Sequence, residues 1–188
     1  MRIFWACGYD QAPVDVLCRG MGMPRASLYQ SYGDKEGLFL AAVDHYAATR
    51  LKPVIAALGP AGSLHEDLTQ FFHQVVQLAA ADSETPGCLI SSVLANAAAG
   101  NATFQAERDR RFEALEKRIA IRLAADGWPD EGSCSKSVAA SLAAAMARGL
   151  VSRARSGQRA EQLHPVGIAA ADALIALRER ALTTGTGQ

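Results

Sequence analysis

The side chains that most often carry catalysis or bind metals are scattered along this chain of 188 residues. Its four histidines form neither an HxxxH nor an HExxH pattern, and its four cysteines contain no CxxC pair. No serine lies in a nucleophile-elbow context, and no glycine-rich loop follows a strand pattern. We therefore expect no enzyme active site, no metal site and no cofactor, and we interpret the cysteines as free thiols in a reducing compartment.

One cysteine near the middle of the chain has a context that indicates reactivity. The run from Thr85 through Pro86 and Gly87 to Cys88 and Leu89 predicts a helix start, with Thr85 as N-cap and Pro86 at the first position. Unpaired N–H groups and the positive end of a helix dipole favour a thiolate in the first turn. Against this, no Lys or Arg lies within several residues, and free cysteine usually packs as a small hydrophobic residue. Cys88 is thus either a sensor of electrophiles and oxidants or a packed core residue, and packing is the commoner case.

The chemistry of nucleic-acid binding is better represented, in residues 20–38 (GMGMPRASLYQSYGDKEGL). Gly22 supplies the positive φ that a tight turn requires, and Pro24 suits the first position of the helix that follows. Gly33 ends that helix, and Asp34 is placed to cap the next one. Short helices around a glycine turn predict a helix-turn-helix.

Two short helices are expected before this turn. The first runs from Met1 to Cys7 and is closed by Gly8, and the second opens at Pro13 and reaches about Arg19.

These motifs resemble the DNA-binding signature of the tetracycline-repressor (TetR) family. The resemblance rests on residues 22–29 (GMPRASLY) and 32–38 (YGDKEGL), with Gly8-Tyr9 and residues 14–17 (VDVL) in the same order and spacing. It covers roughly the first 45 residues, and only the helical architecture is similar beyond them. The Gly87-Cys88-Leu89 step also resembles a subgroup of that family, some members of which respond to electrophiles or oxidants through a cysteine.

The resemblance implies which residues contact DNA. Arg25, Ala26, Ser27 and Gln30 match the recognition helix, and Tyr29 and Lys35 match positions that usually contact phosphates. Among them, Arg25 has the planar fork that suits a guanine edge. Residues 1–50 contain five Lys or Arg and five Asp or Glu, so their formal charge is zero. Any DNA affinity must therefore come from the local placement of a few cations and helix N-termini.

The rest of the chain predicts helices, because apolar residues recur at helical spacing and no stretch alternates as a strand does. From Asp34 a helix kinked at Pro53 is expected to reach Leu58, and a capping box of Ser63 and Glu66 begins the next helix. Further helices are expected over residues 86–100, 103–125, 135–156 and 165–182, followed by a frayed tail over residues 183–188. The predicted fold is all-α, with an N-terminal helix-turn-helix head of three helices and a C-terminal helical bundle.

An effector pocket is expected among the middle helices, where large apolar side chains recur. The candidate lining residues are Phe71, Phe72, Val75, Leu89, Val93, Asn96, Phe104 and Phe112. Such aromatic stripes form a core more often than a ligand site. Asn96 lies seven residues after Leu89, so it is expected on the same face, either as a polar ligand contact or bonded to the backbone.

The two C-terminal helices are rich in small side chains, which suits close helix packing. In the resembled family the last two helices pair across a two-fold axis, which implies a homodimer through residues 135–156 and 165–182. The alternative is that they pack within one chain. A symmetric dimer also suits palindromic half-sites one helical turn apart, about 34–36 Å.

The resulting hypothesis is a ligand-responsive transcriptional regulator, by resemblance a repressor. Residues 1–48 would form a head that binds double-stranded operator DNA, and residues 49–188 a ligand-binding and dimerisation body. A small-molecule or electrophilic effector would release the DNA. With no apolar run of about 18 residues and no signal-peptide pattern, a cytoplasmic location without membrane association is expected.

A second hypothesis concerns the N-terminus. In the resembled family the first helix begins earlier and follows a basic arm that reaches the minor groove, so this chain is expected to be truncated. The alternative function is a helical small-molecule sensor or interaction protein whose DNA binding is impaired by the missing arm.

Overall fold

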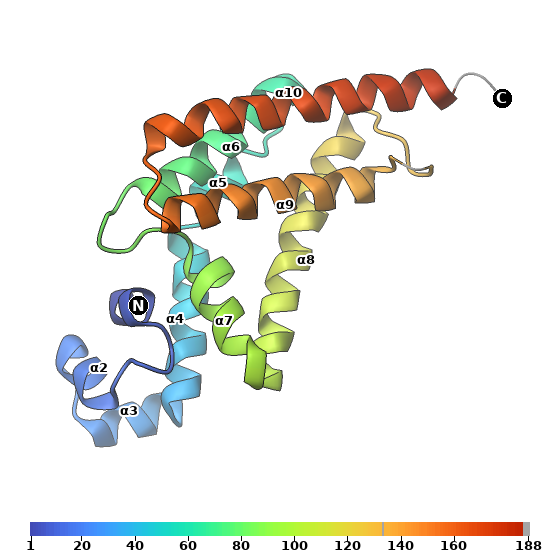
Figure 1. The fold of residues 1–188 in the computed structure, drawn as a ribbon. Coiled ribbons are helices and arrows are strands. Elements are labelled where there is room, and N and C mark those ends of the chain that lie inside the picture. The colour runs from blue at the N-terminus through green and yellow to red at the C-terminus, as the bar shows by residue number, and fades with distance from the viewer. Residues whose placement is uncertain (133, 186–188) are drawn as a thin grey trace.

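The computed structural model describes residues 1–132 and 134–185, and within them every regular element is a helix (Figure 1). The head and its connection consist of α1 (Arg2–Cys7), α2 (Val14–Met21), α3 (Arg25–Tyr32), α4 (Lys35–Thr49) and α5 (Lys52–Ala56). The body consists of α6 (Leu64–Ala80), the π-helix η1 (Leu89–Leu94), α7 (Ala95–Ala97), the 3₁₀-helix η2 (Ala98–Gly100), α8 (Ala102–Ala125), α9 (Lys136–Arg155) and α10 (Ala160–Gly185). The predicted all-α fold is confirmed. In the described part of the chain, none of these helices has the length and apolarity needed to cross a membrane.

The elements form two groups joined by long helices. In Figure 1, α1 to α3 lie at one end, whereas α6, α9 and α10 lie together at the other. Two helices connect these ends: α4 rises from the head, and α8 begins at the lower end of the molecule and rises toward the body. The head therefore has two helical attachments to the body.

The turns of the head follow the predicted glycines and caps. Gly22 has a left-handed backbone (φ 62°), and its N–H bonds back to the end of α2. Gly33 also has a positive φ, and the Asp34 carboxylate accepts a hydrogen bond from the Gly37 N–H at 2.8 Å. Pro24 lies one residue before α3 rather than at its first position. These local signals fix the direction in which α3 leaves the turn.

The predicted kinked helix from Asp34 to Leu58 is two helices in the structure. The first ends at Thr49 and the second begins at Lys52, with Pro53 in its first turn. Proline has no N–H to donate, and its ring clashes with the carbonyl four residues earlier, which belongs to Thr49. The chain therefore breaks there instead of bending.

The last helix begins earlier than its proline predicts. Its first residue is Ala160, and Pro165 lies inside the helix. The Arg159 N–H donates to the Gln162 side-chain carbonyl at 3.0 Å, which satisfies one N–H at the helix entry. The helix continues through Gly185, so residues 183–185 of the predicted frayed tail are helical, and residues 186–188 lie outside the described residues.

The N-terminal end of α8 is attached to the head. Phe104 is fully buried, with its ring centroid 4.8 Å from that of Tyr9 and 5.2 Å from that of Phe39. The Asn101 side chain caps α8 by accepting from the Phe104 N–H at 3.0 Å and donates to the Glu36 carboxylate at 2.7 Å. One residue of the body is therefore part of the aromatic core of the head.

A buried ion pair fixes the other end of α8. Arg122 Nε donates to the Asp67 carboxylate at 2.6 Å, and both side chains are at most 5% exposed. Asp67 also accepts from the backbone N–H groups of Ala61 and Gly62, at 3.3 and 3.2 Å. Because its acceptor sites are shared between an arginine and two N–H groups, this carboxylate holds α6, α8 and the preceding turn together.

We expect Asp67→Ala to lower the free energy of unfolding by about 3–5 kcal/mol, because Arg122 would stay buried without its charge partner. Urea denaturation followed by circular dichroism measures this. The control Glu113→Ala breaks an exposed pair with Lys117 and should cost less than about 1 kcal/mol. Equal stability of Asp67→Ala and wild type would show that the pair does not hold α8.

Candidate nucleic-acid interface

The helix α3 has one buried face and one exposed face. Leu28 is fully buried in a core cluster that also contains Leu17 of α2 and Leu38 of α4. The predicted DNA-contacting residues Arg25, Ala26, Tyr29 and Gln30 are exposed, and Ser27 is half-buried. The helix thus presents polar and small side chains outward from a packed support.

In the absence of DNA, Arg25 is paired within the head. Its Nε donates to the Asp15 carboxylate of α2 at 2.6 Å, and the two side chains are 57% and 65% exposed. This hydrogen bond lowers the pKa of Asp15 and raises the pKa of Arg25. Exposed pairs of this kind contribute little to stability, so the guanidinium is available for another acceptor at low cost.

Lys35 also has partners within the head. Its Nζ donates to the Asp10 carbonyl at 3.2 Å and lies 4.7 Å from the centroid of the Tyr9 ring. Burial raises the pKa of Tyr9, and the charges of Glu36 and Asp34 raise it further. The phenol therefore stays neutral and offers its ring face to the ammonium group. The predicted phosphate contact of Lys35 remains a prediction, alongside this internal role.

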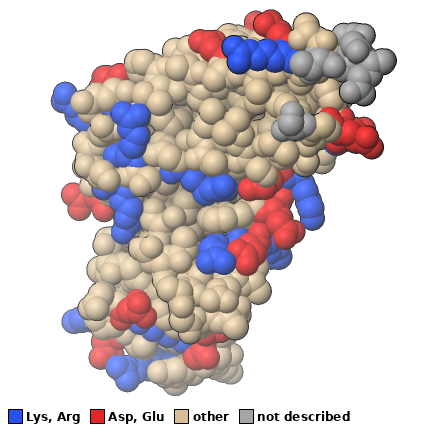
Figure 2. Space-filling view, turned by 45° about the vertical axis from the view of Figure 1, so that its right-hand side comes forward, with Lys and Arg blue, Asp and Glu red and all other residues tan. Residues whose placement is uncertain are grey.

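The two tyrosines of α3 differ in their surroundings. Tyr29 is 47% exposed, whereas Tyr32 is half-buried against the hydrophobic core. Tyr29 can thus donate its hydroxyl to a phosphate without leaving its place in the helix. On the face seen in Figure 2, acidic and basic side chains are interspersed at the end of the molecule that contains the head, in keeping with the zero formal charge of residues 1–50.

The residues predicted to line an effector pocket are mostly part of the hydrophobic core. The rings of Phe71 and Phe72 pack edge to face at 5.1 Å, and Val75, Leu89 and Val93 are buried in the same core cluster. Two of the phenylalanines lie elsewhere. Phe104 packs on the rings of Tyr9 and Phe39, and the half-buried Phe112 ring lies 4.9 Å from the Arg148 guanidinium. The structure therefore does not place the predicted lining residues around a single cavity.

Asn96 is exposed, so its expected place on the apolar face of Leu89 is wrong. Residues Leu89–Leu94 form a π-helix, whose i→i+5 hydrogen bonds widen each turn. A spacing of seven residues then no longer returns to the same face.

The predicted helix start at Pro86 is also wrong. Regular structure begins at Leu89, and Cys88 lies just before it with an extended backbone. The Thr85 hydroxyl donates to the Asp82 carboxylate at 3.0 Å and caps no helix. Cys88 is buried, which favours the packing interpretation.

A surface groove lies between α9 and α10, and the sequence did not predict it. Its volume is about 350 Å³, and its lining is apolar apart from Arg153: Met146, Gly149, Leu150, Arg153, Val166, Ala169, Ala170 and Ala173. Large apolar side chains are also exposed on these helices, including Leu142 and Ile168. The predicted dimerisation segments thus pack on each other within the chain and still leave an apolar outer face.

A three-helix head whose third helix projects exposed side chains, followed by a helical body, defines a helix-turn-helix DNA-binding protein. No protein-family model matches the sequence. The chain is 29% identical over 119 residues to the uncharacterised HTH-type transcriptional regulator YezE of Bacillus subtilis, a match covering 63% of this chain and 59% of YezE.

Solved structures are similar over more of the chain. The TetR-family transcriptional regulator CifR, as a cysteine mutant complexed with 26-base-pair operator DNA, is 27% identical with a TM-score of 0.77, over 92% of this chain and 91% of CifR. A TetR regulator from Rhodococcus sp. RHA1 is 25% identical with a TM-score of 0.59, over 93% and 94%. This chain is thus similar in sequence and fold to transcriptional regulators of the TetR family.

The pairing of Arg25 with Asp15 leads to a pH-dependent prediction. Because the folded pKa of Asp15 is lowered, its stabilising contribution is present above the unfolded pKa and is lost as pH falls through the folded pKa. In Arg25→Ala the carboxyl pKa should rise toward its ordinary value. Carbon-detected NMR titration of the Asp15 carboxyl measures the shift, and identical midpoints in the two proteins would exclude the pair in solution.

Proposed function

We propose that this chain is a transcriptional regulator that binds palindromic operator DNA as a homodimer, acts as a repressor, and is released by a small-molecule effector. The observation that carries the proposal is the exposed face of α3 on a packed helix-turn-helix, in a chain similar over 92% of its length to a regulator solved with its operator. In this proposal α3 enters the major groove of DNA.

The side chains of α3 divide into two roles. Arg25 would exchange the Asp15 carboxylate for the O6 and N7 acceptors of a guanine, with Ala26, Ser27 and Gln30 against neighbouring bases. Tyr29 and Lys35 would contact phosphates and set the register of the helix in the groove. Since residues 1–50 have no net charge, binding by this surface would depend on these contacts more than on a general attraction to DNA.

The dimer would form through the outer face of α9 and α10. Small side chains such as Gly149, Ala169 and Ala173 border the groove there and allow two helix pairs to approach closely. In Figure 1 these helices lie at the end of the molecule away from α2 and α3. A two-fold axis through this face would leave both heads free to bind successive half-sites.

Binding of an effector in the body would require a local change in the buried core. The apolar set around Phe71, Phe72 and Val93 would have to rearrange to admit a ligand, because these side chains are buried against one another. Release through Cys88 would require an electrophile to reach a buried thiol. Both routes need local opening of η1, and a π-helix is a frequent feature of functional sites.

To test DNA binding, operator fragments are first selected from a random double-stranded library, and affinities are then measured by fluorescence anisotropy. Arg25→Ala should weaken binding by about 1–3 kcal/mol and relax preference at one base pair. Lys35→Ala should weaken all sequences alike and lower the salt slope by roughly 0.9.

The matched control is Lys117→Ala, which removes an exposed cation from α8, far along the chain from the head. It should leave affinity and salt slope unchanged. Failure of the wild type to enrich any sequence would instead favour the alternative function, a helical sensor that does not bind DNA tightly.

To test assembly, Ala169→Arg and Ala173→Arg place a charge on the groove face without entering the core of the chain. Each should convert a dimer into monomers, because a buried unpaired charge is costly. Light scattering coupled to size exclusion measures the mass. The control Ile121→Arg alters a 62% exposed apolar residue of α8 and should remain dimeric. A wild-type monomer at micromolar concentration would refute the dimer.

A further inference from the structure

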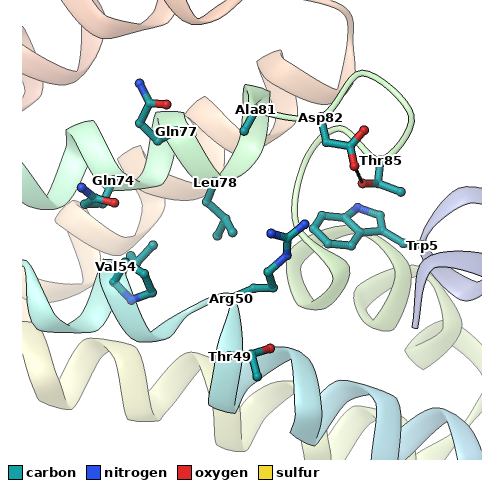
Figure 3. Close-up of a pocket in the computed structure, with 11 residues that line it drawn as sticks. Trp5, Thr49, Arg50, Val54, Gln74, Gln77, Leu78, Ala81, Asp82 and Thr85 are labelled. Atoms are coloured by element: carbon teal, nitrogen blue, oxygen red, sulfur yellow. Dashed lines mark hydrogen bonds between the residues drawn. The ribbon is translucent and has the colours of Figure 1, made fainter.

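A pocket lies at the junction of the head and the body (Figure 3). Its volume is about 240 Å³. Three stretches that are distant in the sequence contribute to it: Trp5 from α1, the end of α4 with α5, and one face of α6 with the loop that follows it. The pocket is separate from the core residues around Phe71 and Phe72.

Part of the lining of the pocket is apolar, formed by Trp5, Pro53, Val54, Leu78 and Ala81. In Figure 3, Val54 of α5 lies near Leu78 of α6, and the Trp5 ring lies on the other side of Leu78. Trp5 is held in place because its indole N–H donates to the Pro86 carbonyl at 3.3 Å and its ring packs edge to face on Tyr46 at 4.9 Å. The surface available to a ligand is therefore largely preformed.

Most polar groups around the pocket already have partners. Asp82 accepts from Arg2 at 2.6 Å, from the Thr85 hydroxyl at 3.0 Å and from the Glu84 N–H at 2.9 Å. The Glu84 and Thr85 hydrogen bonds lower the pKa of Asp82, and Arg2 lowers it further. The Thr49 hydroxyl donates to the His45 carbonyl at 2.6 Å.

Arg50 is different. Among the residues the structure describes, its guanidinium has neither a hydrogen-bond acceptor nor a carboxylate partner, and Figure 3 shows it extending toward Trp5. The half-buried Gln74 amide, on the facing helix, is likewise without a described partner. Arg2 balances Asp82, so Arg50 leaves the pocket with one uncompensated positive charge.

We propose that this pocket binds a small aromatic carboxylate, with the carboxylate on Arg50 and the ring against Leu78, Val54 and Pro53. The planar guanidinium fork matches the two oxygens of a carboxylate. Pockets that take drug-sized ligands start at about 300 Å³, so this one suits a single ring with a short acidic side chain.

The position of the pocket gives the site a regulatory meaning, which rests on the proposed function. A bound ligand would touch α1 of the head, the α4–α5 junction and α6 of the body at the same time. It would therefore bind differently to two orientations of the head, and that difference is what shifts a conformational equilibrium. The binding step itself does not depend on operator recognition and is tested separately.

The test is a titration of the full chain with phenylacetate and with its neutral isostere phenylacetamide. Isothermal calorimetry uses the unaltered protein, and tryptophan fluorescence of Trp128→Phe leaves Trp5 as the sole reporter, because the chain has two tryptophans. We expect phenylacetate to bind with a Kd of about 1 mM or tighter and the amide at least about 10-fold more weakly.

Two variants locate the site, and one serves as control. Arg50→Gln should weaken phenylacetate binding about 10-fold or more, and Leu78→Trp should abolish it by filling the pocket while keeping the charge. Lys117→Gln removes an exposed cation elsewhere and should bind as wild type does. Folding of each variant is checked by circular dichroism.

Equal binding by Arg50→Gln and wild type would overturn the proposal. So would the absence of phenylacetate binding to the wild type at roughly ten times the expected Kd. Because these outcomes are read without DNA, they leave operator binding undecided, and a failure of operator binding would leave this site intact.

Discussion

The position of the DNA-binding head depends on Phe104, a residue of the body that lies in the aromatic core of the head. Its ring contacts Tyr9 and Phe39, and the cap of its helix, Asn101, is hydrogen-bonded to Glu36. Each aromatic pair contributes about 0.5–1.5 kcal/mol beyond the burial of its area. The orientation of α3 is thus set by α8, which the Asp67–Arg122 ion pair fixes at its other end.

Features encoded within a few residues of the sequence were predicted well. The turn at Gly22, the cap at Asp34 and the capping box of Ser63 with Glu66 are all present, because each needs only its own neighbours in the chain. The inward position of Leu28 follows from helical spacing in the same way. Such signals are enough to predict the helix-turn-helix.

Features that depend on distant residues were not predicted. The π-helix after Cys88 moved Asn96 to the surface, and the spacing of its apolar residues does not distinguish it from an α-helix. Phe104 was expected in a ligand pocket because its helix is amphipathic, whereas only the fold shows that this end of α8 reaches the head. The junction pocket was beyond prediction for the same reason, since Trp5, Arg50 and Leu78 are far apart in the sequence.

The head meets the body on two sides, and the contacts on these two sides differ in strength. On the α8 side, aromatic rings are buried together, and moving them apart would expose apolar area to water. On the α1 side, the contacts include the exposed Arg2–Asp82 ion pair, worth about 0–1 kcal/mol, and the Trp5 hydrogen bond to the Pro86 carbonyl. Rotation of the head about Phe104 would thus open the α1 side first. The junction pocket lies on that side, so the proposed ligand would act where the least free energy is needed to change the position of α3.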